Sequence, residues 1–326
     1  MESEWVRLFR CPECKSKKLI LSHTPAQAEV ELGGPRIACE ACGHLVPIRN
    51  GIPRFVPESN YANSFGFQWN RHRRTQLDSY SGVPISRSRL FSVTQWKEDL
   101  QGERILEAGS GAGRFTEILL QTGASVYSFD YSNAVDANFE NNRQSANLTL
   151  FQGDIYNIPI LPGSFDKVIC LGVLQHTPEP ARAFLSLATM VRPGGELVID
   201  VYANTVIARM QWYYLLRPIT RRMEKDMLYR FIAKWAPRLI PVARVLRAVA
   251  GRAGARLVPI AEYSHLGLSP EINREWAVLD TFDMYSPAHD HPQSMSAVQR
   301  WFETAGFSEI AVRRGPNGVI GKGRKI

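Results

Sequence analysis

The sequence predicts an α/β protein whose mostly parallel β-sheet is covered by helices on both faces. Short apolar, β-branched segments alternate with helical segments between residues 103 and 202. A glycine-rich turn follows the first of these segments, and two C-x-x-C pairs precede them all. We therefore expect five parts: a cysteine-rich module at 1–58, an aromatic and basic connector at 59–102, the core at 103–202, a helical insertion after the fifth strand at 203–293, and a closing helix with a β-hairpin at 294–326.

Composition fits a folded protein in a reducing compartment. The chain has 326 residues, of which 44% are hydrophobic, enough to bury a full core. No segment has the length and apolar character of a membrane-spanning helix, and the start MESEWVRLFRCPEC lacks an apolar signal region. These features predict a cytoplasmic protein. The formal net charge of +8 favours an acidic partner: RNA, an anionic membrane surface or a phosphorylated substrate.

The cysteine pairs predict a metal site. Cys11 and Cys14 are separated by 24 residues from Cys39 and Cys42. Four thiolates at this spacing can close a tetrahedral Zn²⁺ site with no coordination position left for a substrate, so the expected role is structural. Cys170 stands inside an apolar segment and is expected in the core.

A cofactor loop is predicted in ILEAGSGAGRF. Glu107 ends the first core strand, and Gly109, Gly111 and Gly113 follow it, with a helix opening at Arg114. Glycine permits the tight turn and a close approach of backbone to ligand. A dinucleotide-binding loop would carry its third glycine where this chain has Arg114. The G-x-G-x-G form after an acid indicates S-adenosyl-L-methionine (SAM) instead.

Two further acids follow at suitable intervals. Asp130 ends the second strand, where a carboxylate can accept hydrogen bonds from both ribose hydroxyls. Asp154 follows the third strand in GDIYNIP, where it would bind the adenine amino group while Ile155 packs on the ring. The alternative is that these acids only cap helices and stabilise turns.

From Glu103 to Val201, and less fully in the closing hairpin, the chain resembles the class I SAM-dependent methyltransferases, in particular the branch with the ubiquinone and menaquinone biosynthesis enzymes. The resemblance implies a Rossmann-like sheet and methyl transfer near the carboxyl ends of the strands. The expected cofactor contacts are Glu107, Gly109, Ser110, Gly111, Gly113, Asp130, Tyr131, Asp154, Ile155 and Leu171, with Gln68 and Trp69 of the connector as a lid. Alternatively, the connector aromatics only attach that segment to the sheet.

The N-terminal module is similar to the zinc-ribbon activator subunit of several RNA and release-factor methyltransferases, over the run ACGHLVPIRNGIPRFV. This likeness implies stabilisation or docking.

Histidines are the candidate catalytic groups. His176 follows the fourth strand in VLQHTP and is a candidate base, or else a helix cap. His289 and His291 lie in LDTFDMYSPAHDHPQS, which we expect to be a loop that orients a polar substrate or supplies its base. A second metal ion bound by these histidines is the other reading.

The predicted function is methylation of a small-molecule, sugar or lipid-linked acceptor, most simply at oxygen. The alternative is an rRNA or tRNA methyltransferase whose zinc ribbon docks RNA, although the fourth strand lacks the N/D-P-P-Y/F motif of base-amino methyltransferases. An inert adaptor is the third reading. The basic, apolar insertion would either enclose the substrate or lie peripherally on an anionic membrane, at its inner face.

Overall fold

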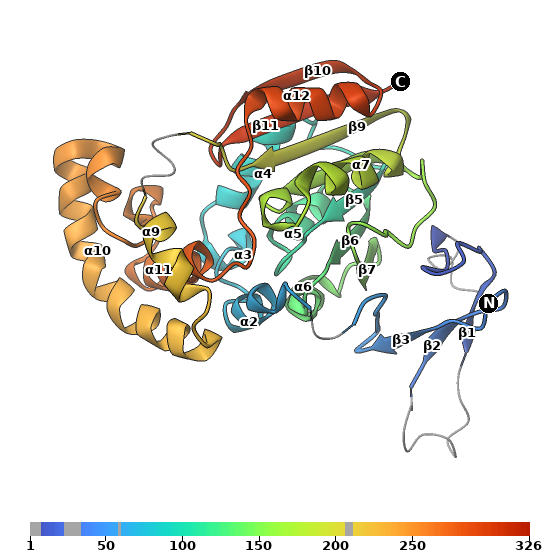
Figure 1. Cartoon of the computed structure of the whole chain (residues 1–326), viewed down its shortest axis with the longest axis horizontal. Helices are drawn as coiled ribbons and strands as arrows, with labels where there is room; N and C mark the ends of the chain where they lie inside the picture. The colour runs from blue at the N-terminus through green and yellow to red at the C-terminus, as the bar shows by residue number, and fades with distance from the viewer. Residues whose placement is uncertain (1–7, 23–33, 58–59, 206–210) are drawn as a thin grey trace.

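The computed structural model describes residues 8–22, 34–57, 60–205 and 211–326. Within this described part, a seven-stranded sheet in the order β10-β11-β9-β8-β5-β6-β7 forms the centre of the molecule (Figure 1). Its strands are β5 (Arg104–Ala108), β6 (Ser125–Asp130), β7 (Leu148–Gln152), β8 (Phe165–Leu171), β9 (Val191–Val201), β10 (Phe307–Arg314) and β11 (Val319–Lys325). β5 to β9 pair in parallel, whereas β11 pairs antiparallel with both β9 and β10.

Successive side chains of each core strand enter two different apolar layers, as expected when helices cover both faces of a sheet. In β8, Val168 and Cys170 belong to one buried cluster, and Ile169 and Leu171 belong to the other. The first cluster is closed by α7 (Pro180–Met190) and α12 (Met295–Thr304), and the second by α4 (Ile85–Thr94) and α5 (Arg114–Gln121). Helix α6 (Ala134–Asn142) connects β6 to β7. Cys170 is buried, as predicted.

The described part of the connector, from residue 60 on, forms three short helices. These are α2 (Asn63–Arg71), α3 (Asp78–Ser81) and α4. Gly82 ends α3 with φ of 70°, and Pro84 precedes α4. The Asp78 carboxylate accepts hydrogen bonds from the backbone N–H groups of Ser86 and Arg87, both at 2.8 Å, so it satisfies two donors at the start of α4.

The insertion has a small core of its own, built from α9 (Trp212–Thr220), α10 (Lys225–Ala255) and α11 (Pro270–Tyr285). Ile232 of α10 and Phe282 of α11 are buried in that core, and Phe67 of α2 packs against it. Figure 1 shows α10 curving around the outside of α9 and α11, at the end of the molecule opposite the N-terminal sheet. Among the described residues, no helix is both long and apolar enough to span a bilayer.

The prediction of a loop across LDTFDMYSPAHDHPQS is wrong for its first part, since Asp280, Asp283 and Tyr285 lie on α11. Ser269 caps this helix by accepting from the backbone N–H of Ile272, and Pro270 occupies its first turn. The helix continues because its apolar residues, Trp276 and Phe282 among them, are buried on neighbouring elements. Density of titratable groups is a weak sign of a loop when every third or fourth residue is apolar.

The N-terminal module is a small antiparallel sheet of β1 (Leu19–Ser22), β2 (Arg36–Cys39), β3 (Leu45–Arg49) and β4 (Ile52–Pro53), which lies beside the β7 edge of the central sheet (Figure 1). The Phe9 ring stacks on Phe55 at 5.1 Å and meets the edge of Phe151, a β7 residue, at 5.2 Å. Arg54 forms an ion pair of 2.6 Å with Asp136 of α6. The module is therefore packed into the protein core, and the predicted fold class is confirmed.

Candidate active site

The glycine loop between β5 and α5 has a backbone that only glycine adopts without strain. Gly109, Gly111 and Gly113 have φ values of 76°, 53° and 87°. A Cβ atom at Gly109 would lie 2.3 Å from Val173, and one at Gly113 would lie 2.2 Å from the Asn138 side chain. The three glycines are thus required by the turn and by the neighbours packed around it.

A cavity of about 310 Å³ opens over this loop, at the carboxyl ends of the parallel strands. This is the edge at which open α/β sheets bind ligands. The predicted cofactor residues that line it are Gly109, Ser110, Gly111, Asp130, Tyr131, Ile155, Leu171 and Trp69. Those that do not line it are Glu107, Gly113, Asp154 and Gln68.

Asp130 is held with its carboxylate in the cavity wall. One oxygen accepts from the Gly111 backbone N–H at 3.0 Å, and the other accepts from the backbone N–H and the hydroxyl of Ser132 at 2.8 and 2.7 Å. Burial raises the pKa of this carboxyl, and the three hydrogen bonds oppose that shift. A carboxylate has about four acceptor positions, so with three in use one remains, on the oxygen that accepts from Gly111, for a ribose hydroxyl.

Glu107 lies beneath the loop rather than in the cavity wall. Its Oε2 accepts from the hydroxyl of Thr116 and, at 2.7 Å, from the hydroxyl of Ser128. Within the described part of the chain, its buried Oε1 has no hydrogen-bond partner. Burial raises the Glu107 pKa to about 7. The buried Ser110 hydroxyl, which lies on the loop itself, likewise has no partner in the described residues.

These features fit SAM. The loop offers backbone at close approach, Asp130 offers an acceptor for a ribose hydroxyl, and Ile155 offers an apolar surface for an adenine ring. The unpartnered Ser110 hydroxyl is a further polar group that a ligand could satisfy.

The connector covers the side of the cavity next to the glycine loop. Trp69 of α2 lies against Gly111, since a Cβ at that glycine would be 3.2 Å from its ring. Gln68 is fully buried and does not line the cavity, and it donates from Nε2 to Asp283 of α11 at 3.0 Å. Trp69 therefore contacts the cofactor side, while Gln68 links α2 to the insertion.

The other end of the cavity is polar and charged. Helix α11 contributes Asp280 and Asp283. Asp280 accepts from the Tyr263 hydroxyl, from the Trp276 indole at 3.1 Å and from the Gln76 amide at 2.9 Å. Burial raises the Asp280 pKa to about 6. The other polar residues that line the cavity, which the sequence analysis missed, are Tyr61, Arg73, Gln76, Arg89, Arg114, Thr177, Tyr202, Tyr263 and Asn317.

One of the missed residues carried a sequence signal. Tyr202 directly follows β9, so its position at the carboxyl end of a parallel strand predicts a place in the site. Arg89 and Tyr263 belong to the connector and the insertion, whose positions over the sheet are set by tertiary packing alone. No spacing rule would have found them.

His176 lines the cavity, whereas the other two candidate histidines do not. Its Nδ1 lies 3.0 Å from the backbone carbonyl of His289, and because a carbonyl only accepts, Nδ1 carries the hydrogen in the neutral ring. No partner for Nε2 is present among the described residues, and this nitrogen is left as the proton acceptor. His289 stacks beside His291 at 5.8 Å, and burial lowers the His289 pKa.

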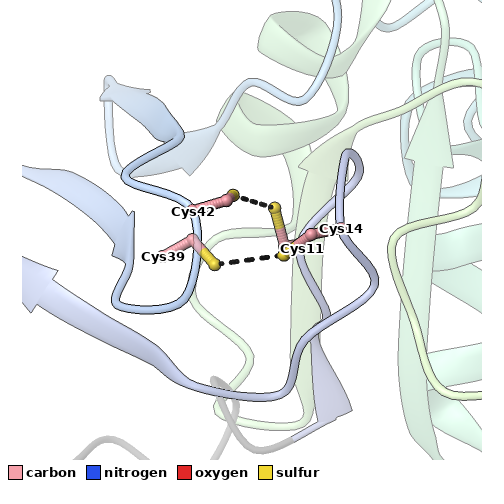
Figure 2. A group of neighbouring side chains, drawn as sticks. All are labelled: Cys11, Cys14, Cys39 and Cys42. Atoms are coloured by element: carbon pink, nitrogen blue, oxygen red, sulfur yellow. Dashed lines mark hydrogen bonds between the residues drawn. The ribbon is translucent and has the colours of Figure 1, made fainter.

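The four paired cysteines converge on one point (Figure 2). Their Sγ atoms all lie within 4.8 Å of one another, and Cys11–Cys42 and Cys14–Cys39 are each 3.6 Å apart. Thiolates about 2.3 Å from a zinc ion form a tetrahedron with edges of about 3.8 Å. The cluster therefore fits a closed tetrahedral Zn²⁺ site.

This cluster is attached to the segment that carries Ile155. Phe9 forms a β-bridge with Ile160, and the Arg10 N–H donates to the carbonyl of Pro159 at 3.0 Å. Asn157 donates from its amide to the carbonyl of Pro12 at 3.2 Å, between the first two cysteines. The turn that carries Cys11 and Cys14 and one wall of the cavity are thus physically connected.

Comparison with known proteins agrees with the class that this geometry defines. Residues 106–199 match the family described as a methyltransferase domain. A ubiquinone biosynthesis O-methyltransferase from Ralstonia nicotianae is 30% identical over 134 residues, covering 40% of this chain and 54% of the relative. The enzyme of the same name from Methylococcus capsulatus is 29% identical over 129 residues, covering 37% and 54%. The chain spans about half the length of these curated relatives.

Solved structures of similar fold are more distant in sequence. The complex of the Haloferax volcanii Trm112 methyltransferase activator with a methyltransferase has a TM-score of 0.48 at 10% identity, covering 80% of this chain and 97% of the other. A SAM-dependent methyltransferase from Aquifex aeolicus has a TM-score of 0.40 at 14% identity, covering 82% and 98%. The family match confirms the methyltransferase domain predicted from the glycine loop and its acids.

Proposed function

We propose that the chain is a SAM-dependent methyltransferase that methylates a hydroxyl oxygen of a small polar acceptor. The observation that carries this proposal is a single cavity that joins the glycine loop and Asp130 to His176 and the carboxylates of α11. Relatives described as O-methyltransferases add support for oxygen as the methyl acceptor.

SAM supplies an activated methyl group on sulfur, and the protein supplies alignment and a dry site. Asp130 would accept from a ribose hydroxyl, the glycine loop would hold the amino-acid end, and Ile155 would pack on the adenine. Trp69 covers the loop and excludes water.

His176 acts as the base in this proposal. Nε2 takes the proton of the acceptor hydroxyl while the oxygen bonds to the methyl carbon and the carbon–sulfur bond breaks, which yields a methyl ether and S-adenosylhomocysteine. The His289 carbonyl fixes the required tautomer by accepting from Nδ1. His289 and His291 then have a supporting role, through backbone and ring packing.

Asp280 and Asp283 suit an acceptor with several hydroxyls, such as a sugar or a polyphenol, because carboxylates accept from hydroxyl donors. Tyr202 and Asn317 offer donors and acceptors nearby. We also propose that the cysteine cluster holds one structural Zn²⁺, since it leaves no open coordination position.

The test is methyl transfer from labelled SAM to three defined acceptor groups: catechols, free sugars and total RNA. We expect label in the small-molecule fraction as an alkali-stable ether. Label found in RNA alone would overturn the proposal and favour the RNA methyltransferase predicted as the alternative.

With the acceptor that works best, His176→Ala should reduce kcat by about 100-fold while the affinity for SAM stays within about twofold. His289→Ala is the matched control, because its ring lies outside the cavity lining, and it should retain most of the activity. If His289→Ala causes the selective loss and His176→Ala does not, the base belongs to the insertion.

A further inference from the structure

The insertion presents a large apolar surface to solvent. Along α10, six apolar side chains are between 45% and 81% exposed: Met227, Phe231, Trp235, Val242, Val245 and Val249. Their spacings of three, four or seven residues place them on one face of the helix. The opposite face carries Leu228, Ile232 and Ile240, which are buried in the core of the insertion. An apolar solvent-facing side is the reverse of an ordinary surface helix.

Helix α9 has the same property over a shorter length. Trp212, Leu215, Leu216 and Ile219 follow the i, i+3, i+4, i+7 pattern and are between 40% and 67% exposed. The Trp212 indole donates to the carbonyl of Leu257, just beyond the end of α10, at 3.0 Å. The two helices therefore meet at this point, where Leu257 is also exposed. We call these exposed residues of α9, α10 and Leu257 the apolar face.

Basic side chains lie around the apolar face and between its residues. Exposed basic residues on and beside the two helices are Arg221, Arg222, Arg230, Lys234, Arg238, Arg244, Arg252 and Arg256. In the same described stretch, from 211 to 257, Glu224 is the single exposed acid. Lys234 and Arg238 both lie 5.6 Å from the centre of the Trp235 ring, so charge and aromatic surface are interleaved.

Two other arginines of the insertion have structural partners and do not belong to this surface. Arg217 is buried and forms an ion pair with Asp290. Arg247 forms an ion pair of 2.8 Å with Glu262. Of the cations around the apolar face, Arg230 also forms an ion pair of 2.9 Å with Asp226 of its own helix, but this pair lies at the surface, where an external ligand can reach it.

We infer that the apolar face is a docking surface for an anionic lipid bilayer. At the boundary between headgroups and acyl chains, apolar and aromatic side chains leave water while arginine and lysine stay with the phosphates. A second copy of this chain would bring two sets of cations together, at an electrostatic cost. Nucleic acid would pair with the cations and leave the valines and leucines in water. The proposal goes beyond methyl transfer and does not depend on it.

The test is co-sedimentation of the full chain with vesicles of phosphatidylcholine alone and of phosphatidylcholine mixed with phosphatidylglycerol, over a salt series. We expect binding to the mixed vesicles at low salt, release as salt rises, and no binding to the neutral vesicles. Tryptophan emission should shift to the blue on binding, because Trp212 and Trp235 leave water.

Two double variants measure the contributions of the cations and of the aromatic side chains separately. Arg238→Gln with Arg244→Gln should weaken binding by about 30-fold, since each cation contributes about a factor of five near an anionic membrane. Phe231→Ser with Trp235→Ser should weaken binding by more than about tenfold and remove much of the blue shift. All four residues are exposed, so folding should be preserved.

Matched controls come from α7, on another side of the protein. Arg182→Gln removes an exposed cation and Leu185→Ser removes an exposed apolar side chain, and both should bind vesicles as the unchanged chain does. The inference is overturned if the unchanged chain does not co-sediment with anionic vesicles at low salt. It is also overturned if the α10 variants bind these vesicles as tightly as the controls do, or if the chain co-sediments with RNA in the same assay but not with the vesicles.

Discussion

Glu107 shows how a residue can lie next to a site without lining it. Its carboxyl sits under the glycine loop and accepts from Thr116 and Ser128, which join β5 to α5 and β6. Burial raises its pKa to about 7, so near neutral pH a large part of the population holds a proton there. The contact of Glu107 with the cofactor stays a prediction; in the structure its carboxyl joins the base of the loop to α5 and β6.

This pKa makes the stability depend on pH in a defined direction. Because the folded chain holds a proton on Glu107 up to about pH 7 and the unfolded chain releases it near 4.5, stability falls as pH rises through that window. Glu107→Gln cannot titrate. Relative to the unchanged protein, this variant should gain about 2 to 3 kcal/mol between about pH 5 and about pH 8.

Urea unfolding at several pH values, without SAM, measures this difference. Glu140→Gln on the exposed side of α6 is the control, and its difference from the unchanged protein should stay constant. A constant difference for Glu107→Gln as well would show that Glu107 stays ionised in the folded protein.

At this scale the sequence predicted the residues that local geometry determines. Asp130 and the glycines follow strand ends at known intervals, so one sequence is enough to identify them. Asp154 follows the same rule, yet its carboxylate accepts from the Tyr156 N–H and caps a turn instead of lining the cavity. Arg89 and Tyr263 line the cavity only because of tertiary packing, and no periodic pattern in the sequence indicates that packing.

At the scale of elements, the N-terminal module contacts the segment that carries one wall of the candidate cofactor site. Its residues Phe9 and Arg10 pair with residues 159 and 160, a few positions after Ile155. The two cysteine pairs predicted the metal cluster, but they contain no information on where the module docks. That information lies in Phe9, Phe55 and Phe151, which read simply as core residues.

We expect Cys39→Ser to lose zinc and to lower the thermal midpoint by about 10 °C or more, since structural zinc contributes folding free energy directly. The affinity for SAM should also fall severalfold, because the segment carrying Ile155 loses its attachment. Metal analysis, a thermal melt and a SAM titration on the same preparation measure all three.

Cys170→Ala is the control for loss of a thiol: Cys170 lies in β8, away from the cluster, so zinc should stay at about one per chain. A Cys39→Ser protein with full zinc content would exclude the proposed ligand set.

Helix α10 illustrates what amphipathic periodicity leaves undecided. The sequence predicted apolar and basic residues on helices of the insertion, either enclosing a substrate or lying on a membrane. In the structure one apolar face of α10 packs on α11, while a second apolar face points to solvent. A helix that is apolar on two sides has no single inward face in its sequence, so only the fold shows which side is exposed.

For the whole molecule, the central claim is that the carboxyl edge of the sheet, α2 and α11 enclose one cavity for SAM and a polar acceptor. The sequence predicted the sheet because alternating strands and helices allow few topologies. It did not predict that α11 completes the cavity, because the order of helices along an insertion does not determine how they fold back over the sheet.

Calorimetric titration of the zinc-loaded chain with SAM tests this claim most directly. We predict binding at one site, weakened by about 30-fold in Asp130→Ala, which removes the carboxylate, and abolished in Gly111→Val, whose side chain would meet Trp69 at a φ of 53°. Asp166→Ala, at the opposite edge of the same sheet, should bind as the unchanged chain does. Equal affinity for SAM in all four proteins, or no binding by the unchanged chain, would contradict the account.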